Sequence, residues 1–266
     1  IVLLNNDTSI SAVQVDGEAA SPGDTVEVPA FTDGVDVVVE TTDPEATYEI
    51  SGETGLVAGE NTLTIIVTAA DGTTVEEFSL TVKVLGDASL SVFEINGSNV
   101  QSGDELILES GTTDIELIVE SLDPLAEVDI AGDSGLVTGN NTLVVRVTAS
   151  DGETVAEYTI SLYVLPSSDT SLSVFQVNGV DVEDGDTVEL APGSTDIELV
   201  IETTNPAASY EVSGDDGLFV GTNELVVTVT AENGQTREFV VLLEVPANDD
   251  ASVASITVNG EVVSAD

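Results

Sequence analysis

The side chains available for chemistry in this chain are almost all carboxylates. The sequence holds 51 Asp and Glu residues against three Lys and Arg, and it contains no His, Cys, Met or Trp. Without His or Cys, a nucleophile–base pair and an imidazole metal site are excluded. Paired carboxylates can hydrolyse glycosides, but in so acidic a chain such pairs are expected by chance. The sequence therefore predicts no enzymatic activity.

Calcium is the metal for which this composition provides ligands, because Ca²⁺ takes about 6 to 8 oxygen ligands from carboxylates and carbonyls. All the candidate ligands lie close to a predicted turn or linker. They are Asp43, Glu60, Asp87, Asp151 and Asp169. No other cofactor is implied by the sequence.

The elements that must position these residues repeat along the chain. A tripeptide recurs about every 80 residues, as Asp7-Thr8-Ser9, Asp87-Ala88-Ser89, Asp169-Thr170-Ser171 and Asp250-Ala251-Ser252. The period predicts three complete repeats, at residues 7–86, 87–168 and 169–249. Residues 1–6 would end a preceding repeat with its last strand and linker, and residues 250–266 would begin a further one with its first strand. We therefore expect a segment of a longer array.

Within each copy, apolar residues alternate with polar ones, a pattern typical of strands with one buried face. In the second copy, for example, Leu143, Val145 and Val147 share one face. Each copy holds about seven such strands, which suits a sandwich of two sheets. An Asp-Gly or Asn-Gly pair, at 71–72, 151–152 and 233–234, predicts a type I′ hairpin turn. We therefore predict an all-β fold of tandem immunoglobulin-like or cadherin-like antiparallel β-sandwiches in a linear array.

The linkers between copies are short, so neighbouring repeats should abut and form a semi-rigid rod. If strands run alternately up and down, Asp87 and Asp151 lie at the top of the second repeat, and Asp43 and Glu60 lie at the bottom of the first. These carboxylates would then form a junction site for calcium. The alternative is turn chemistry alone, because Asp and Asn share it and Asn205 stands in the third repeat where the first has Asp43.

The formal net charge of −48 is predicted to lie on the outside of a folded chain, because 41% hydrophobic residues exceed what a disordered acidic tail contains. This charge excludes nucleic-acid binding, which needs clusters of Lys and Arg. It also opposes binding to anionic lipid. No apolar run approaches the roughly 20 residues of a membrane helix, so no direct membrane insertion is expected in this segment.

One segment of each repeat, together with an aromatic residue after it, has a familiar pattern of turns and alternating strand residues. The three examples are Gly221–Gly234 with Phe239, Gly59–Gly72 with Phe78, and Gly139–Gly152 with Tyr158. The pattern resembles the bacterial cadherin-like β-sandwich repeat, and the resemblance covers nearly the whole chain three times. It implies a large surface or secreted prokaryotic protein, used as a stalk, adhesin or fibre, and it implies no catalytic residues.

We therefore expect a structural repeat region of an extracellular or cell-surface prokaryotic fibre, stalk or S-layer-like assembly, acting as a rod, spacer or polymer subunit. Its expected partners are copies of itself or neighbouring repeats in a filament or layer. The alternative is an adhesin or carbohydrate-binding module, in which one repeat should carry an unusual exposed aromatic residue or a loop insertion. Phe93 and Phe175 share a position in the first strand of their copies and are expected to pack in the core or between repeats.

Overall fold

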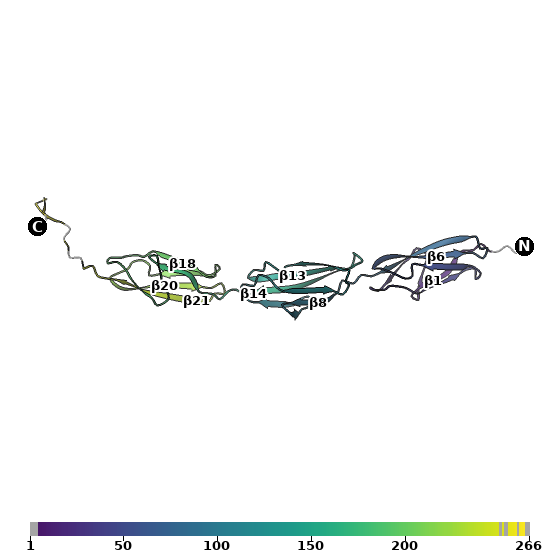
Figure 1. Cartoon of the computed structure of the whole chain (residues 1–266), viewed down its shortest axis with the longest axis horizontal. Coiled ribbons are helices and arrows are strands. Elements are labelled where there is room, and N and C mark those ends of the chain that lie inside the picture. The colour runs from purple at the N-terminus through teal and green to yellow at the C-terminus, as the bar shows by residue number, and fades with distance from the viewer. Residues whose placement is uncertain (1–4, 250–251, 253–254, 260, 264–266) are drawn as a thin grey trace. The chain divides into compact units, whose positions relative to one another are not determined.

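The computed structural model describes residues 5–249, 252, 255–259 and 261–263. The chain divides into two compact units, Ile1–Val164 and Leu165–Asp266. The elements of the described part are all β-strands (Figure 1). Within it, no helix is long and apolar enough to cross a membrane. The strand predicted for residues 1–4 and the turn residues Asp250, Ala251 and Gly260 lie outside the described residues.

The first repeat consists of seven strands in two sheets. They are β1 (Ile10–Val15), β2 (Glu18–Ala20), β3 (Thr25–Val28), β4 (Val37–Thr41), β5 (Thr47–Ser51), β6 (Gly59–Thr68) and β7 (Val75–Val84). A three-stranded sheet has the order β2-β1-β4, and a four-stranded sheet has the order β3-β7-β6-β5.

The same arrangement recurs twice. The second set comprises β8 (Leu90–Ile95), β9 (Ser98–Asn99), β10 (Glu105–Leu108), β11 (Leu117–Ser121), β12 (Glu127–Ala131), β13 (Gly139–Thr148) and β14 (Val155–Val164). The third comprises β15 (Leu172–Val177), β16 (Val180–Asp181), β17 (Thr187–Glu189), β18 (Leu199–Thr203), β19 (Ser209–Ser213), β20 (Gly221–Thr230) and β21 (Thr236–Val245). Two short strands follow, β22 (Ile256–Val258) and β23 (Glu261–Val263). We propose the repeat limits 7–86, 87–168 and 169–249 from the sequence period; each range holds one set of seven strands.

Each set of strands encloses its own hydrophobic core. In the first, Val15 of β1 and Val39 of β4 pack with Leu63 of β6 and Val82 of β7, so both sheets contribute. Burying such a side chain stabilises the fold by roughly 1.5–3 kcal/mol. The alternation seen in the sequence thus places one face of each sheet inside, and the predicted all-β sandwich is confirmed.

One strand pair in every repeat departs from the antiparallel pattern. β3 runs parallel to β7, with Thr25 opposite Thr81 and Val28 opposite Val84. The pairs β10–β14 and β17–β21 are also parallel. The cause is a crossover: after β2, the chain leaves the three-stranded sheet and joins the edge of the other one, running in the direction of β7. Each four-stranded sheet is therefore mixed.

The predicted hairpin between β6 and β7 is present, but the prediction of a type I′ turn for it was wrong. Gly72 has a φ of 71°, whereas Asp71 is not in the left-handed region that a type I′ turn would require. The Asp71 carboxylate instead accepts a hydrogen bond from the Thr74 N–H at 2.7 Å, which stabilises a longer loop. The type I′ conformation occurs between β1 and β2, where Asp16 and Gly17 have φ values of 50° and 84°.

Candidate functional site: the repeat junction and an aromatic groove

The predicted linker carboxylates, Asp87 and Asp169, each cap the start of a repeat. The Asp87 Oδ1 accepts hydrogen bonds from the N–H of Ser89 at 2.7 Å and from its hydroxyl. Asp169 accepts the same two hydrogen bonds from Ser171, at 2.8 and 2.5 Å. The hydroxyl of Ser171, followed by its N–H, holds the pKa of Asp169 below its usual value. Both linker acids are therefore turn-capping residues.

Asp151 connects the second repeat to the linker that follows the first. Its Oδ1 accepts hydrogen bonds from the N–H groups of Glu153 and Thr154, at 2.9 and 2.8 Å. Its Oδ2 accepts one from the Gly86 N–H at 2.8 Å. Burial by itself raises the pKa of Asp151, but the hydrogen bonds from Thr154, Glu153 and Gly86 together lower it to about 2. The carboxylate is thus held ionised at the junction.

Gly86 can be replaced only with a local shift, because the two repeats approach each other closely at this residue. A Cβ there would lie 2.5 Å from the Asp151 Cγ and 2.6 Å from the Ala149 Cβ. Beside this contact, the Lys83 Nζ donates a hydrogen bond to the Glu153 Oε2 at 2.8 Å, and the same contact raises the pKa of Lys83. The Glu153 side chain is 69% exposed, so this ion pair adds little stability.

Asp43 does not lie where the sequence placed it. The N–H of its neighbour Thr42 donates to the Ser9 carbonyl at 2.9 Å, which places Asp43 at the start of the first repeat, away from Gly86. The short strand β2 adds a chain reversal, and this reversal moves the following loop to the opposite end. The junction position is occupied instead by the equivalent residue of the second repeat, Asp123, which accepts a 2.5 Å hydrogen bond from the Ser150 hydroxyl.

Glu60 does lie at the junction end of the first repeat, opposite Lys83 in the pairing of β6 with β7. In the part of the chain that the structure describes, no group of three or more acidic side chains is arranged to hold a metal ion. The oxygens of Asp87, Asp123 and Asp151 accept hydrogen bonds from N–H and hydroxyl groups instead. Calcium binding therefore stays a prediction.

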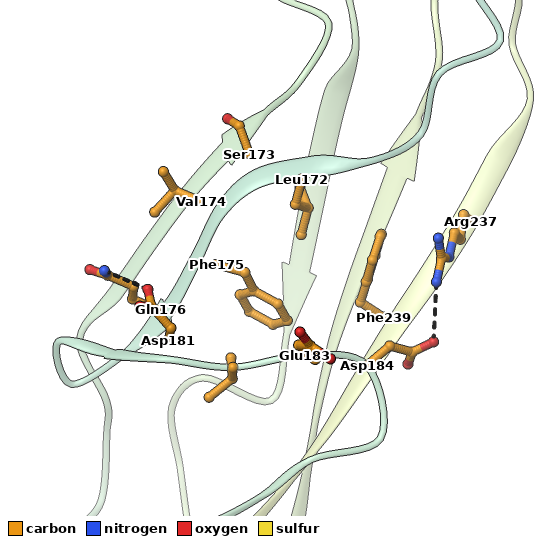
Figure 2. Close-up of a pocket in the computed structure, with 11 residues that line it drawn as sticks. Leu172, Ser173, Val174, Phe175, Gln176, Asp181, Glu183, Asp184, Arg237 and Phe239 are labelled. Carbon is orange, nitrogen blue, oxygen red and sulfur yellow. Dashed lines mark hydrogen bonds and ion pairs between the residues drawn. The ribbon is translucent and has the colours of Figure 1, made fainter.

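A separate feature of the third repeat is a groove of 590 Å³ between β15 and β21 (Figure 2). The rings of Phe175 and Phe239 form its floor, edge to face, with centroids 6.3 Å apart. The Arg237 guanidinium lies 4.4 Å from the centre of the Phe239 ring and pairs with Asp184, Nη2 to Oδ2, at 3.6 Å. The groove thus combines an apolar floor with one of the chain's three cations.

An equivalent groove of 530 Å³ occurs in the second repeat. Phe93 and Tyr158 form its floor, 6.2 Å apart, and the Tyr158 hydroxyl donates to the Ala88 carbonyl at 3.0 Å. Phe93 and Phe175 are only 8% and 7% exposed and belong to the hydrophobic cores of their repeats, so the core role expected for them is confirmed. The second and third repeats thus share a groove with an aromatic floor. The rims differ, because Arg237 lines the groove of the third repeat.

Several residues that matter at these sites were not singled out from the sequence. Gly86 matters because the backbone there approaches the second repeat closely, and Asp123 matters because it accepts a hydrogen bond from Ser150. The sequence of a single repeat indicates neither contact. Arg237 had a usable signal, because the other two repeats carry Glu76 and Ala156 at its position.

No family model matches the chain, and no curated protein is significantly similar to it. Similar solved structures include Drosophila N-cadherin EC1-3, at 12% identity and a TM-score of 0.33, covering 86% of this chain and 99% of that one. Sidekick-1 immunoglobulin domains 1-5 show 10% identity and a TM-score of 0.33, covering 90% and 60% of the two chains. Protocadherin Gamma B2 extracellular cadherin domains 3-6 show 16% identity and a TM-score of 0.26, covering 86% and 72%.

These similar structures consist of cadherin or immunoglobulin domains. The β-sandwich fold follows from the strand order and the cores of the chain itself. The resemblance to the bacterial cadherin-like repeat stays a prediction.

Proposed function

We propose that this chain is a structural repeat region of an extracellular prokaryotic fibre, stalk or S-layer-like assembly, and that it acts as a rod, spacer or polymer subunit. The observation that carries the proposal is the direct junction of the first two repeats. There the Gly86 N–H is bonded to Asp151 and Lys83 is paired with Glu153. Such contacts hold the linker between these two repeats, which favours a semi-rigid spacer over a flexible tether.

The strand pairing of the first repeat supports the same role. The chain enters beside Asp71, whose N–H donates to the Asn5 carbonyl, and leaves at the opposite end after β7. Tension along the chain would therefore pull β7 lengthwise past β6 and β3, its two neighbours in the sheet. The hydrogen bonds of the antiparallel β6–β7 pair lie perpendicular to the strands and those of the parallel β3–β7 pair are slanted, so shear of β7 loads both sets of bonds together rather than one bond at a time.

The carboxylate-rich surface fits an extracellular setting. A net charge of −48 repels other copies, and dissolved salt shortens the range of that repulsion. Copies of the chain could then associate through sheet edges, since open sandwiches have unpaired edge strands. The proposed partners are accordingly other copies or neighbouring repeats, and no catalytic activity is proposed.

Electron microscopy of the native source tests this function directly. Antibodies against the chain, carrying gold particles, are expected to label filaments, stalks or a surface layer. Label confined to the cell interior, with none on surface structures, would refute the proposal.

A binding role is the second candidate, and the groove of the third repeat favours it. Arg237 lies on the rim of this groove, where the other repeats carry Glu76 and Ala156. Outside the groove, Phe219 is 64% exposed and aromatic where the other repeats carry Val57 and Val137. Exposed aromatic rings and a cation are groups that adhesive surfaces use. Screening the chain against immobilised glycans should give binding that R237A weakens if the groove is the site, and that F219V weakens if the exposed Phe219 ring is. Binding unchanged by both variants, or none, would exclude these residues as the binding surface.

A further inference from the structure

The loop between β3 and β4 holds a phenylalanine in a backbone conformation that suits glycine. Phe31 has a φ of 65°, and the other non-glycine residues with positive φ in the described part of the chain are Asp or Asn. The equivalent positions in the second and third repeats are Gly111 and Gly193, with φ values of 81° and 82°. A bulky side chain is rare in this region because its Cβ crowds the backbone, so its presence indicates a compensating function.

The environment of Phe31 suggests what that function is. Its side chain is 59% exposed, and it lines a cavity of 220 Å³ between the first two repeats. Leu125, from the loop between β11 and β12, lines the same cavity from the second repeat and is 79% exposed. Phe31 and Leu125 are thus two large apolar side chains that lie outside the hydrophobic cores and line the same cavity at the junction.

Leu125 is as unusual among the repeats as Phe31. Glu45 stands at its position in the first repeat and Ala207 in the third. Neither unusual residue recurs in another copy, yet the fold brings the two to the same cavity. Val57 and Leu85 add further apolar surface on the side of the first repeat. Two residues that are unusual among the repeats and that line one cavity from opposite sides are what a matched interface would produce.

We propose that Phe31 and Leu125 form a matched apolar pair that selects the second repeat as the neighbour of the first and limits its rotation. The interaction surface is the C-terminal end of the first repeat. The partner that fits it is the N-terminal end of a repeat that carries leucine at the position of Leu125. A glutamate at the position of Leu125, as in the first repeat, would place a charge beside the phenyl ring of Phe31, and such a repeat would not be selected as the neighbour. The repeats are thus not interchangeable, whether or not the chain belongs to a fibre.

Spin labels on the full chain test the pairing, because the protein contains no cysteine and engineered ones are unique. Glu49 of β5 and Asp129 of β12 are exposed and occupy equivalent positions in the two repeats, so E49C with D129C reports their relative orientation. We expect a narrow distance distribution in the parent and a broadened or shifted one in F31G and in L125E. The control is I107A, which removes a 73% exposed apolar side chain of β10 that does not line the cavity.

Thermal unfolding separates this effect from a loss of folding. F31G should unfold at the parent temperature or above it, because glycine adopts positive φ freely, whereas F31A should unfold at a lower temperature than F31G. A distance distribution in folded F31G or L125E as narrow and as centred as that of the parent would overturn the proposal. The same change in I107A would also overturn it. Neither result bears on the microscopy of native filaments, so the proposed function is tested separately.

Discussion

The Oδ2 of Asp151 accepts a hydrogen bond of 2.8 Å from the N–H of Gly86, and this bond ties the hairpin turn of the second repeat to the linker that follows the first. The other oxygen of the same carboxylate organises the turn itself, through Glu153 and Thr154. One side chain therefore closes a loop and holds two repeats together.

Replacing Asp151 should separate its hydrogen-bonding role from its charge. In the third repeat Asn233 occupies the same position, and its Oδ1 accepts a 2.9 Å hydrogen bond from the Gln235 N–H. D151N should therefore keep the turn, whereas D151A should cost about 1 kcal/mol of stability, as the loss of a capping acceptor does. Chemical denaturation of both variants measures the difference. Equal stability of D151A and the parent would show that the turn forms without the acceptor.

The lowered pKa of Asp151 makes a prediction about pH. Its value is about 2 in the folded chain, against about 3.9 for an unfolded aspartate. The unfolded state therefore binds the proton first, and the stability that this group contributes is present above about pH 4 and lost as the pH falls toward about 2. The stability difference between the parent and D151N should shrink over that window. A difference that stays constant with pH would contradict the assignment.

The separate cores predict that damage to one repeat stays local. Leu143 is fully buried in the second core, so L143A should destabilise that repeat by about 2–5 kcal/mol. The control is V144A, at the next, partly buried position of the same strand. Scanning calorimetry should show one transition lowered in L143A while the transition of the third repeat is unchanged. A uniform shift of all unfolding would indicate that the repeats unfold as one cooperative unit.

Salt should stabilise the chain because it screens the repulsion among its carboxylates. We expect the melting temperature to rise with NaCl, and to rise equally with CaCl₂ at the same ionic strength, because the junction carboxylates are already engaged with hydrogen-bond donors. Thermal melts in the two salts and a calorimetric titration with Ca²⁺ provide the measurements. Saturable binding that D87N and D151N abolish would instead establish the junction calcium site predicted from the sequence.

The sequence predicted the strands well because burial acts locally on them. Alternation such as Leu143, Val145 and Val147 depends only on which face meets the core, and all three side chains are fully buried. The turn type at Asp71 was harder to predict, because Asp-Gly suits two turns and the hydrogen bond to Thr74 decides between them. Asp43 was misplaced because a strand as short as β2 leaves a weak periodic signal, yet it reverses the chain.

What the sequence by itself determined is the repeat, its two-residue alternation and the dominance of negative charge, since each depends on residue type and spacing alone. The tertiary structure decided which loops meet. The parallel pairing of β3 with β7, the approach of Gly86 to Asp151 and the shared cavity of Phe31 and Leu125 join residues far apart in the chain. Such contacts depend on the path of the backbone through space, and the type and spacing of residues along the sequence do not by themselves reveal which distant residues that path brings together.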